Sequence, residues 1–124
     1  MTPVNIQRAI AAVFVILGGW ALAAPRSVIA LGLLPEYREG AGMAFAVGCF
    51  GAQACIAGLF AATARFTAAT FAAYGIMLIG FLGFDLWFGW VDPVFTPLGA
   101  ALDGIGNVIM IAACWAGWSK LRRD

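Results

Sequence analysis

Long apolar runs, separated by short polar stretches, dominate the chain. Four of them, roughly 6–24, 40–63, 66–88 and 97–118, reach the length of about 17–25 residues that a membrane-spanning helix needs. Lipid offers no partner to exposed backbone, and the runs lack two-residue alternation, so we expect helices and not strands. The pattern predicts an all-α fold: an integral membrane bundle of four antiparallel transmembrane helices, forming one domain over residues 1–124.

The connections between these runs differ in length and composition. The second is a short turn at Arg65, so the two runs that it joins are expected to form an antiparallel hairpin. The first, residues 25–39, holds an apolar stretch, SVIALGLLP, that is too short to span. We expect this stretch to lie in the membrane interface as an amphipathic turn of helix or to dip back into the bundle. Asp92-Pro93 indicates a turn in the third, and Pro97 suits the first position of the last helix.

The composition supports a bilayer as the solvent. Hydrophobic residues make up 64% of the chain and charged residues only 10%, whereas a soluble domain carries about 25% charged residues. The net charge is +1, and the basic residues form no patch beyond Lys120, Arg122 and Arg123 at the C-terminus. A nucleic acid is therefore not an expected partner.

The chain contains no histidine. This absence excludes His-ligated haem, His-ligated chlorophyll, most zinc sites, and Ser-His or Cys-His catalytic arrangements. Cys49, Cys55 and Cys114 form no CxxC motif and are interpreted as small hydrophobic residues in helix contacts. The sequence thus favours a non-catalytic protein, with no catalytic residue and no metal site predicted.

The distribution of Lys and Arg predicts the orientation. The side with both termini and the second connection holds five basic residues, whereas the opposite side holds only Arg26 and Arg38. The five are Arg8, Arg65, Lys120, Arg122 and Arg123. Both termini are expected in the cytoplasm, and the Ala-, Gly- and Arg-rich usage suits a bacterial inner membrane.

Aromatic residues near the ends of the runs suggest interfacial anchors. Trp87 and Trp90 fit an outer belt, and Trp115 and Trp118 fit a cytoplasmic belt just before the Lys120, Arg122, Arg123 anchor.

An alternative interpretation of the first run is a signal peptide. Arg8, an apolar stretch and Ala21-Leu22-Ala23 resemble a leader with an A-x-A cleavage site, and cleavage would leave three helices and an outside N-terminus. The single positive residue before the apolar stretch favours an uncut helix.

Asp85 and Gln53 are polar residues inside apolar runs. Asp85, in FLGFDLWFGWVDP, lies near the outer end of its run, where an acid costs less than at mid-membrane. It is expected to pair with Arg26 or Arg38 or to take part in binding. Gln53 lies near the middle of its run and should face protein, because an unsatisfied amide costs several kcal/mol in lipid.

Asp103 and Asn107 share one helix face with Gly99, because the three are spaced by four residues. Asn107 lies roughly 14 Å deep and Gln53 about 18–20 Å, so the two amides are expected to meet, directly or through water. Asp103, roughly 8 Å deep, can face Asp85, Arg26 or Arg38. The group is either polar glue, worth about 0.6–2 kcal/mol per bond, or a ligand-binding cleft with Asp103 foremost and Tyr74 as a further donor.

Small residues mark one side of the second run. Small-xxx-small and i, i+3 patterns let helices approach closely, and the residues concerned are Ala44, Gly48, Gly51, Ala52, Cys55 and Gly58.

Residues 51–81, GAQACIAGLFAATARFTAATFAAYGIMLIGF, resemble the DoxX-like small membrane proteins. Arg8 with Gly18-Gly19, Gly58-Leu59 followed by Ala64-Arg65, and Ala68-Ala69 match the family's pattern. The resemblance implies a four-helix bundle and a role linked to quinone-dependent or redox-protective complexes. Two positions depart from it: Gln53 stands where the family has an acid, and the Lys late in the first helix is absent.

Three functional hypotheses follow. The first is a non-catalytic accessory or scaffold subunit whose partners are membrane lipids and other membrane subunits or a second copy of the chain. The second, suggested by the resemblance, is a quinone- or lipid-binding redox accessory protein in which Asp103 and Asn107 bond the head group. The third, a small transporter, ranks last because the first run has no acid between Arg8 and Ala24.

Overall fold

The structure is a computed structural model that describes residues 1–123. Its four long helices are α1 (Pro3–Ala23), α3 (Ala41–Thr63), α4 (Ala68–Leu86) and α5 (Pro97–Leu121). The π-helical turn η2 (Trp87–Val91) continues α4, while α2 (Pro25–Gly32) and the 3-10 turn η1 (Pro35–Tyr37) follow α1. Each of the four long elements, with α4 extended to Val91, is long and apolar enough to cross a membrane. The predicted all-α membrane bundle is confirmed.

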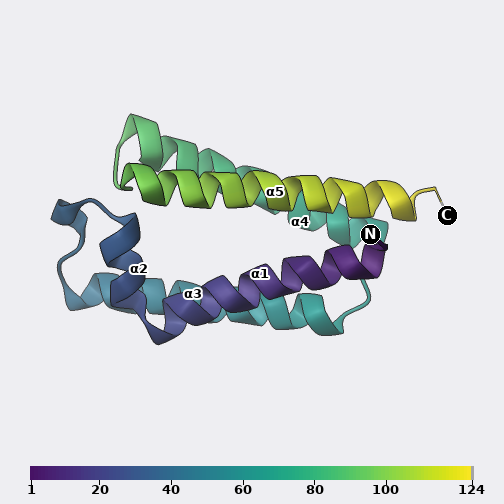
Figure 1. Ribbon diagram of the computed structural model, residues 1–124, viewed down its shortest axis with the longest axis horizontal. Helices are drawn as coiled ribbons and strands as arrows, with labels where there is room; N and C mark the ends of the chain where they lie inside the picture. The colour runs from purple at the N-terminus through teal and green to yellow at the C-terminus, as the bar shows by residue number, and fades with distance from the viewer. Residues whose placement is uncertain (124) are drawn as a thin grey trace.

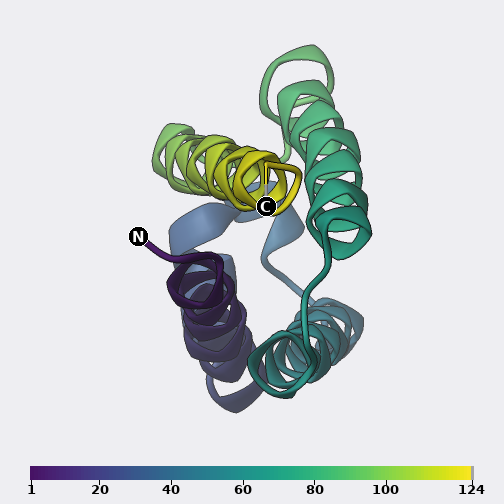
Figure 2. The ribbon, with the colours of Figure 1, turned by 90° about the vertical axis from the view of Figure 1, so that its right-hand side faces the viewer.

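The long helices form two antiparallel pairs (Figure 1). One pair is α1 with α3 and the other is α4 with α5, and Figure 2 shows the pairs stacked one above the other. Both termini and the turn between α3 and α4 lie at one end, which we call the terminal end. The opposite end, which holds α2, η1 and η2, is the loop end.

The expected hairpin of the second and third runs is antiparallel but is not a closely packed pair. α3 packs against α1 instead, because its glycines allow close approach there. Only side chains such as the stacked rings of Phe50 and Phe81, 5.9 Å apart, bridge α3 and α4.

Glycines set the contact between α1 and α3. A Cβ on Gly18 would lie 2.8 Å from the carbonyl oxygen of Gly51, and a Cβ on Gly51 would overlap the backbone of Leu22. A Cβ on Gly58 would lie 2.7 Å from Cγ2 of Val15. Because lipid is as apolar as the side chains, such close packing supplies much of the association. The predicted small-residue face is confirmed at Gly51 and Gly58.

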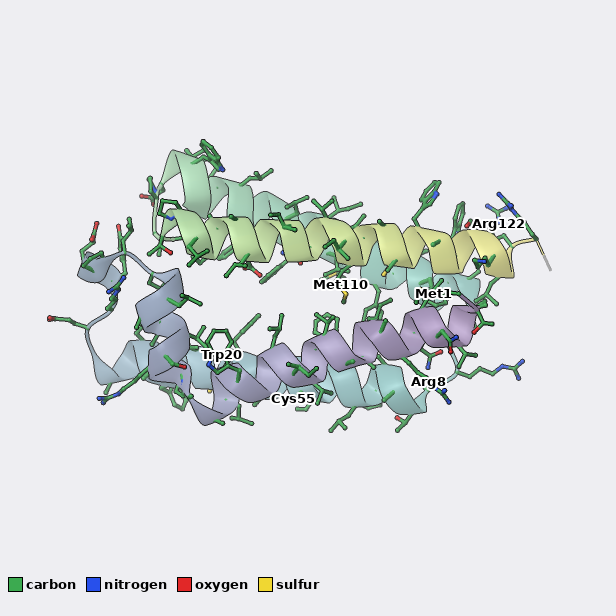
Figure 3. The ribbon with its side chains drawn as sticks, viewed as in Figure 1. Met1, Arg8, Trp20, Cys55, Met110 and Arg122 are labelled. Atoms are coloured by element: carbon green, nitrogen blue, oxygen red, sulfur yellow. The ribbon has the colours of Figure 1, made fainter. Side chains whose placement is uncertain are left out.

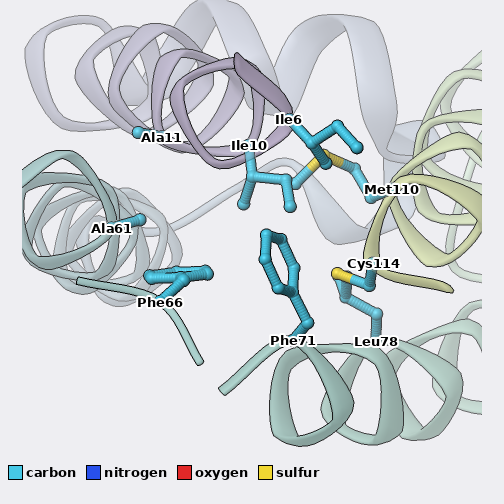
Figure 4. Packing of buried hydrophobic residues seen from close by; sticks show 9 residues of the cluster. All are labelled: Ile6, Ile10, Ala11, Ala61, Phe66, Phe71, Leu78, Met110 and Cys114. Carbon is cyan, nitrogen blue, oxygen red and sulfur yellow. The ribbon is translucent and has the colours of Figure 1, made fainter. Parts of the chain in front are cut away.

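The buried core joins the two pairs near the terminal end (Figure 4). Ile10 of α1, Phe71 of α4 and Cys114 of α5 are fully buried, and Phe66 reaches in from the turn between α3 and α4. The rings of Phe66 and Phe71 meet edge to face, 5.1 Å apart. This cluster fixes how one pair sits on the other.

A buried amide closes the terminal end. Nε2 of Gln7 donates to the carbonyl oxygens of Ala61 and Ala64, each 2.7 Å away, and Oε1 accepts from the backbone N–H of Phe66 at 3.3 Å. The last carbonyls of a helix have no partner within it, so Gln7 satisfies the C-terminal end of α3 from a neighbouring helix.

At the loop end, the first and third connections are joined by backbone hydrogen bonds. The N–H of Thr96 donates to Gly32 O at 2.8 Å, and the N–H of Leu34 donates to Val94 O at 2.9 Å. Thr96 also caps α5 through Gly99 N, at 2.9 Å, and Pro97 begins that helix as predicted. The apolar stretch of the first connection is thus a short helix, α2, that lies against α1, α3 and α5.

The predicted anchors lie at the two ends of the bundle. Trp87 and Trp90 are exposed at the loop end. At the terminal end the rings of Trp115 and Trp118 pack at a tilt with centroids 4.9 Å apart, and the Arg122 guanidinium lies 5.1 Å from the Trp118 ring. Arg8 and Arg122 both lie at this end (Figure 3). Lys120 is in the last turn of α5, and Arg123 follows that helix.

Replacing Gly51 by Ala is expected to destabilise the fold by about 1–3 kcal/mol, because the new methyl group overlaps α1. Gly48→Ala on the same helix is the matched control, since a Cβ there meets nothing within 4 Å and gains only helix propensity. The free energy of unfolding, measured by SDS titration in mixed micelles, compares the two. Equal stability of both variants would contradict the close α1–α3 contact.

Candidate functional site

Two polar side chains meet between α4 and α5. Asp85 lies in the last turn of α4 and is 3% exposed, and Asn107 lies on α5 and is 7% exposed. Nδ2 of Asn107 donates a hydrogen bond to Oδ2 of Asp85. The antiparallel course of the helices brings these positions opposite one another in the loop-end half of the bundle.

The other carboxyl oxygen of Asp85 lacks a partner. Oδ1 is buried, and no group among residues 1–123 bonds to it. A buried polar atom without a hydrogen bond costs free energy, and more so in hydrocarbon than in a soluble core. The carboxyl of Asp103 interacts with that of Asp85 and can donate to it when protonated. When both carboxyls are ionised, Oδ1 depends on a donor from outside the described chain.

Asp103 completes the group, which we call the Asp85 cluster (Asp85, Asp103 and Asn107). It lies one helical turn from Asn107 toward the loop end and is exposed. Its carboxyl interacts electrostatically with that of Asp85. Asp103 and Asn107 thus lie on one face of α5, as their four-residue spacing indicated, and Asp85 of α4 meets that face.

The expected pairing of Asp85 with an arginine is wrong. Asp85 forms no ion pair within residues 1–123, and its side chain faces α5. Arg26 and Arg38 lie instead beside α2 and the start of α3, where Nε of Arg38 donates to Leu33 O at 2.7 Å. The sequence did not show that Arg26 of α2 and Arg38, which follows η1, lie near the start of α3.

The expectation that Gln53 faces protein and meets Asn107 is also wrong. The Gln53 side chain is exposed and makes no hydrogen bond with any described residue. The physical reason is helix rotation: Gly51 must face α1, and two residues further along a helix a side chain points about 200° away. The glycine contact thereby turns Gln53 outward.

Tyr74 is separate from the cluster. Its hydroxyl donates to Ala57 O at 3.2 Å and so links α4 to α3. Its ring packs against Phe14 and Phe66, with centroids 6.1 and 5.2 Å away. Eleven residues separate it from Asp85 on one helix, which is about 16 Å.

Two surface hollows are described, and neither is lined by the Asp85 cluster. One, of about 480 Å³, lies between α2 and the start of α3 and is lined by two arginines. The other, of about 240 Å³, is an apolar groove between α4 and α5 near Phe71 and Trp115. A head group that bonds Oδ1 would have to approach past Asp103. Within residues 1–123, no three acidic or Cys side chains gather where they would hold a metal ion.

The sequence analysis did not identify Gln7 as a residue that holds two helices together. It also did not predict that Arg26 and Arg38 line the same hollow. The position of Gln7 between Ile6 and Ile10, both buried, is the signal that places it on the inner face of α1. No comparable signal indicates where Arg26 and Arg38 converge, because that depends on the path of the first connection.

No protein-family model matches the chain, and no curated protein or solved structure matches it either. The DoxX-like resemblance therefore stays a prediction.

Asn107→Leu is expected to destabilise the fold by about 2–4 kcal/mol, because it leaves the Asp85 carboxyl buried with no hydrogen bond. Replacing both partners by Leu removes the unsatisfied group, so the double variant should recover much of this loss. The free energies of unfolding in mixed micelles complete the double-mutant cycle. Additive losses in the double variant would argue against the bond.

Proposed function

We propose that the protein is a non-catalytic integral membrane protein that acts as an accessory subunit of a larger membrane assembly. The observation that supports this most is Gln53, an exposed amide near the middle of the apolar helix α3. In hydrocarbon such a group lacks water, and an unsatisfied amide costs several kcal/mol. A hydrogen bond from a neighbouring helix removes that cost.

Gln53 belongs to a stripe along α3 that is spaced for helix packing. The exposed residues of this α3 stripe recur every three or four positions: Phe45, Cys49, Gln53, Ile56 and Phe60. This spacing keeps them on one face, and it is the spacing with which one helix packs on another. Only 11% of the α3 span is buried within the chain, against 33% of α1, so α3 offers the most uncovered surface.

The described residues suggest no chemistry of their own. The polar groups along the spans include the Asp85 cluster, two glutamines and a tyrosine, and Gln7 and Tyr74 bond to backbone carbonyls. These polar residues fit association with other membrane helices better than they fit catalysis.

Gln53→Leu is expected to weaken association by roughly tenfold, the effect of losing about 1.4 kcal/mol of interhelical hydrogen bonding. Gln53→Asn keeps the amide and should retain most of it. The measurement is the native mass spectrum of protein extracted gently into lipid nanodiscs, read as the fraction carrying other subunits or a second copy. A wild-type protein that runs only as a lone monomer would contradict the proposal.

We also propose a bacterial inner membrane with both termini in the cytoplasm. Five basic residues at the terminal end against two at the loop end support this orientation.

A green fluorescent protein fused after Arg123 should therefore fluoresce in a bacterial host, whereas alkaline phosphatase fused there should be inactive, because its disulfides form outside the cytoplasm. A control fusion inserted at Glu36, in the loop end, should give the opposite pair of results. Active phosphatase at the C-terminus would reverse the proposed orientation.

A second candidate function is binding of a quinone or lipid head group in a redox assembly, as the DoxX-like resemblance implies. The observation that favours it is Oδ1 of Asp85, a buried acceptor without a donor. A hydroxyl of the reduced quinone, the quinol, or of a lipid head group can donate to it, whereas the carbonyls of the oxidised quinone only accept. Asp103, exposed beside it, would meet the head group first.

Asp103→Ala and Asn107→Ala should then each lower the affinity for a short-chain quinol about tenfold, a loss of one good hydrogen bond. Isothermal titration calorimetry with the quinol reports the affinity. Thr63→Ala, at the exposed terminal end of α3, is the control. Equal affinity in all variants would remove this candidate.

A further inference from the structure

One of the two hollows lies at the loop end, between α2 and the start of α3. Its lining comes from three segments: Arg26, Ile29 and Ala30 of α2; Arg38, Glu39 and Gly40 of the connection; and Ala41 and Ala44 of α3. Its volume is about 480 Å³, within the size range of small-molecule sites. We call it the arginine pocket.

Two guanidinium groups line this pocket without a carboxylate partner. Arg26 and Arg38 take part in no ion pair within residues 1–123. The Nε of Arg38 is held by Leu33 O at 2.7 Å, which orients the guanidinium and leaves its terminal amino groups available. A planar guanidinium favours bidentate bonding to phosphate or carboxylate oxygens. The pocket therefore suits an oxyanion.

The charge of the pocket matches a singly charged anion. Glu39 lines the same hollow as the two arginines, so the formal charge of the lining is +1. A phosphodiester carries one negative charge and complements it, whereas a more highly charged anion would also face the Glu39 carboxylate.

The other residues that line the pocket are mainly apolar. The pocket itself lies where the membrane-spanning helices end. Ile29, Ala30 and Ala44 form the apolar part, and Ile29 is 4% exposed. α2 lies where α1 ends and α3 begins, both of them candidate membrane spans, so the pocket sits at the level of lipid head groups. The start of α3 adds backbone N–H groups, since Gly40 at its N-cap provides no side-chain cap. The arginines remain the principal groups.

We propose that the arginine pocket binds the phosphate of an anionic phospholipid, with Arg26 and Arg38 on the phosphate and the apolar wall against the start of the acyl chains. This site is independent of the proposed accessory function, because it uses neither the α3 stripe nor the Asp85 cluster. It supplies an anionic partner for Arg26 and Arg38, which form no ion pair with an acidic residue within residues 1–123.

The test uses the full chain in detergent, with phosphatidylglycerol as the probe and native mass spectrometry as the readout of bound lipid. One phosphatidylglycerol should be retained by the wild type, and Arg26→Gln/Arg38→Gln should lower its affinity at least tenfold. The matched control is Arg8→Gln/Arg65→Gln, which removes two exposed arginines at the terminal end and should bind as the wild type does. Equal binding by both double variants would overturn the proposal.

Two further arms separate the source of the phosphate and guard against misfolding. Inorganic phosphate alone should bind much more weakly than phosphatidylglycerol, and equal affinity would overturn the lipid assignment in favour of a soluble anion. Arg26→Lys/Arg38→Lys keeps charge and fold but loses bidentate bonding, so its affinity should fall between those of the wild type and the Gln variant. Full wild-type affinity in the Gln variant, with an unchanged melting temperature, would again contradict the site.

Discussion

An amide side chain inside a bilayer must find a hydrogen-bond partner in protein, because lipid provides none. Besides Asn5 in the first turn of α1, three amides lie along the apolar helices, and each has a different environment. Gln7 bonds the last carbonyls of α3 and the turn that follows, and Asn107 bonds Asp85 across α4 and α5. Gln53 has no partner among the described residues and faces outward. The first two amides hold the bundle together, and the third is the one on which the proposed association with another chain rests.

The glycines explain why Gln53 faces outward while Gln7 and Asn107 face the inside of the bundle. Gly18 and Gly51 let α1 and α3 approach until a methyl group no longer fits, and this contact fixes the rotation of α3. The rotation carries Gln53 to the opposite side. The terminal-end core around Phe71 then joins the two helix pairs, while α2 and the 94–96 segment tie them at the loop end. The Asp85 cluster and the arginine pocket both lie toward this loop end, on different helix pairs.

Much of the fold follows from sequence alone, but little of the site does. Run length and apolar composition predicted four spans, and the four-residue spacing of Asp103 and Asn107 placed them on one face. The outward direction of Gln53 was not predictable, because depth in the membrane does not report rotation about the helix axis. The arginine pairing failed for a related reason: the path of residues 25–39 depends on tertiary contacts such as Thr96 with Gly32.

The central claim, that Gln53 finds its partner in another chain, is tested most directly by photo-crosslinking in native membranes. A benzoylphenylalanine placed at Cys49, one turn from Gln53 on the α3 stripe, reports what covers that face, and the same probe at Met77, exposed on α4, is the comparison. We expect a defined protein adduct from position 49 that persists in Gln53→Asn and is strongly reduced in Gln53→Leu. Labelling of lipid alone from both positions would contradict it.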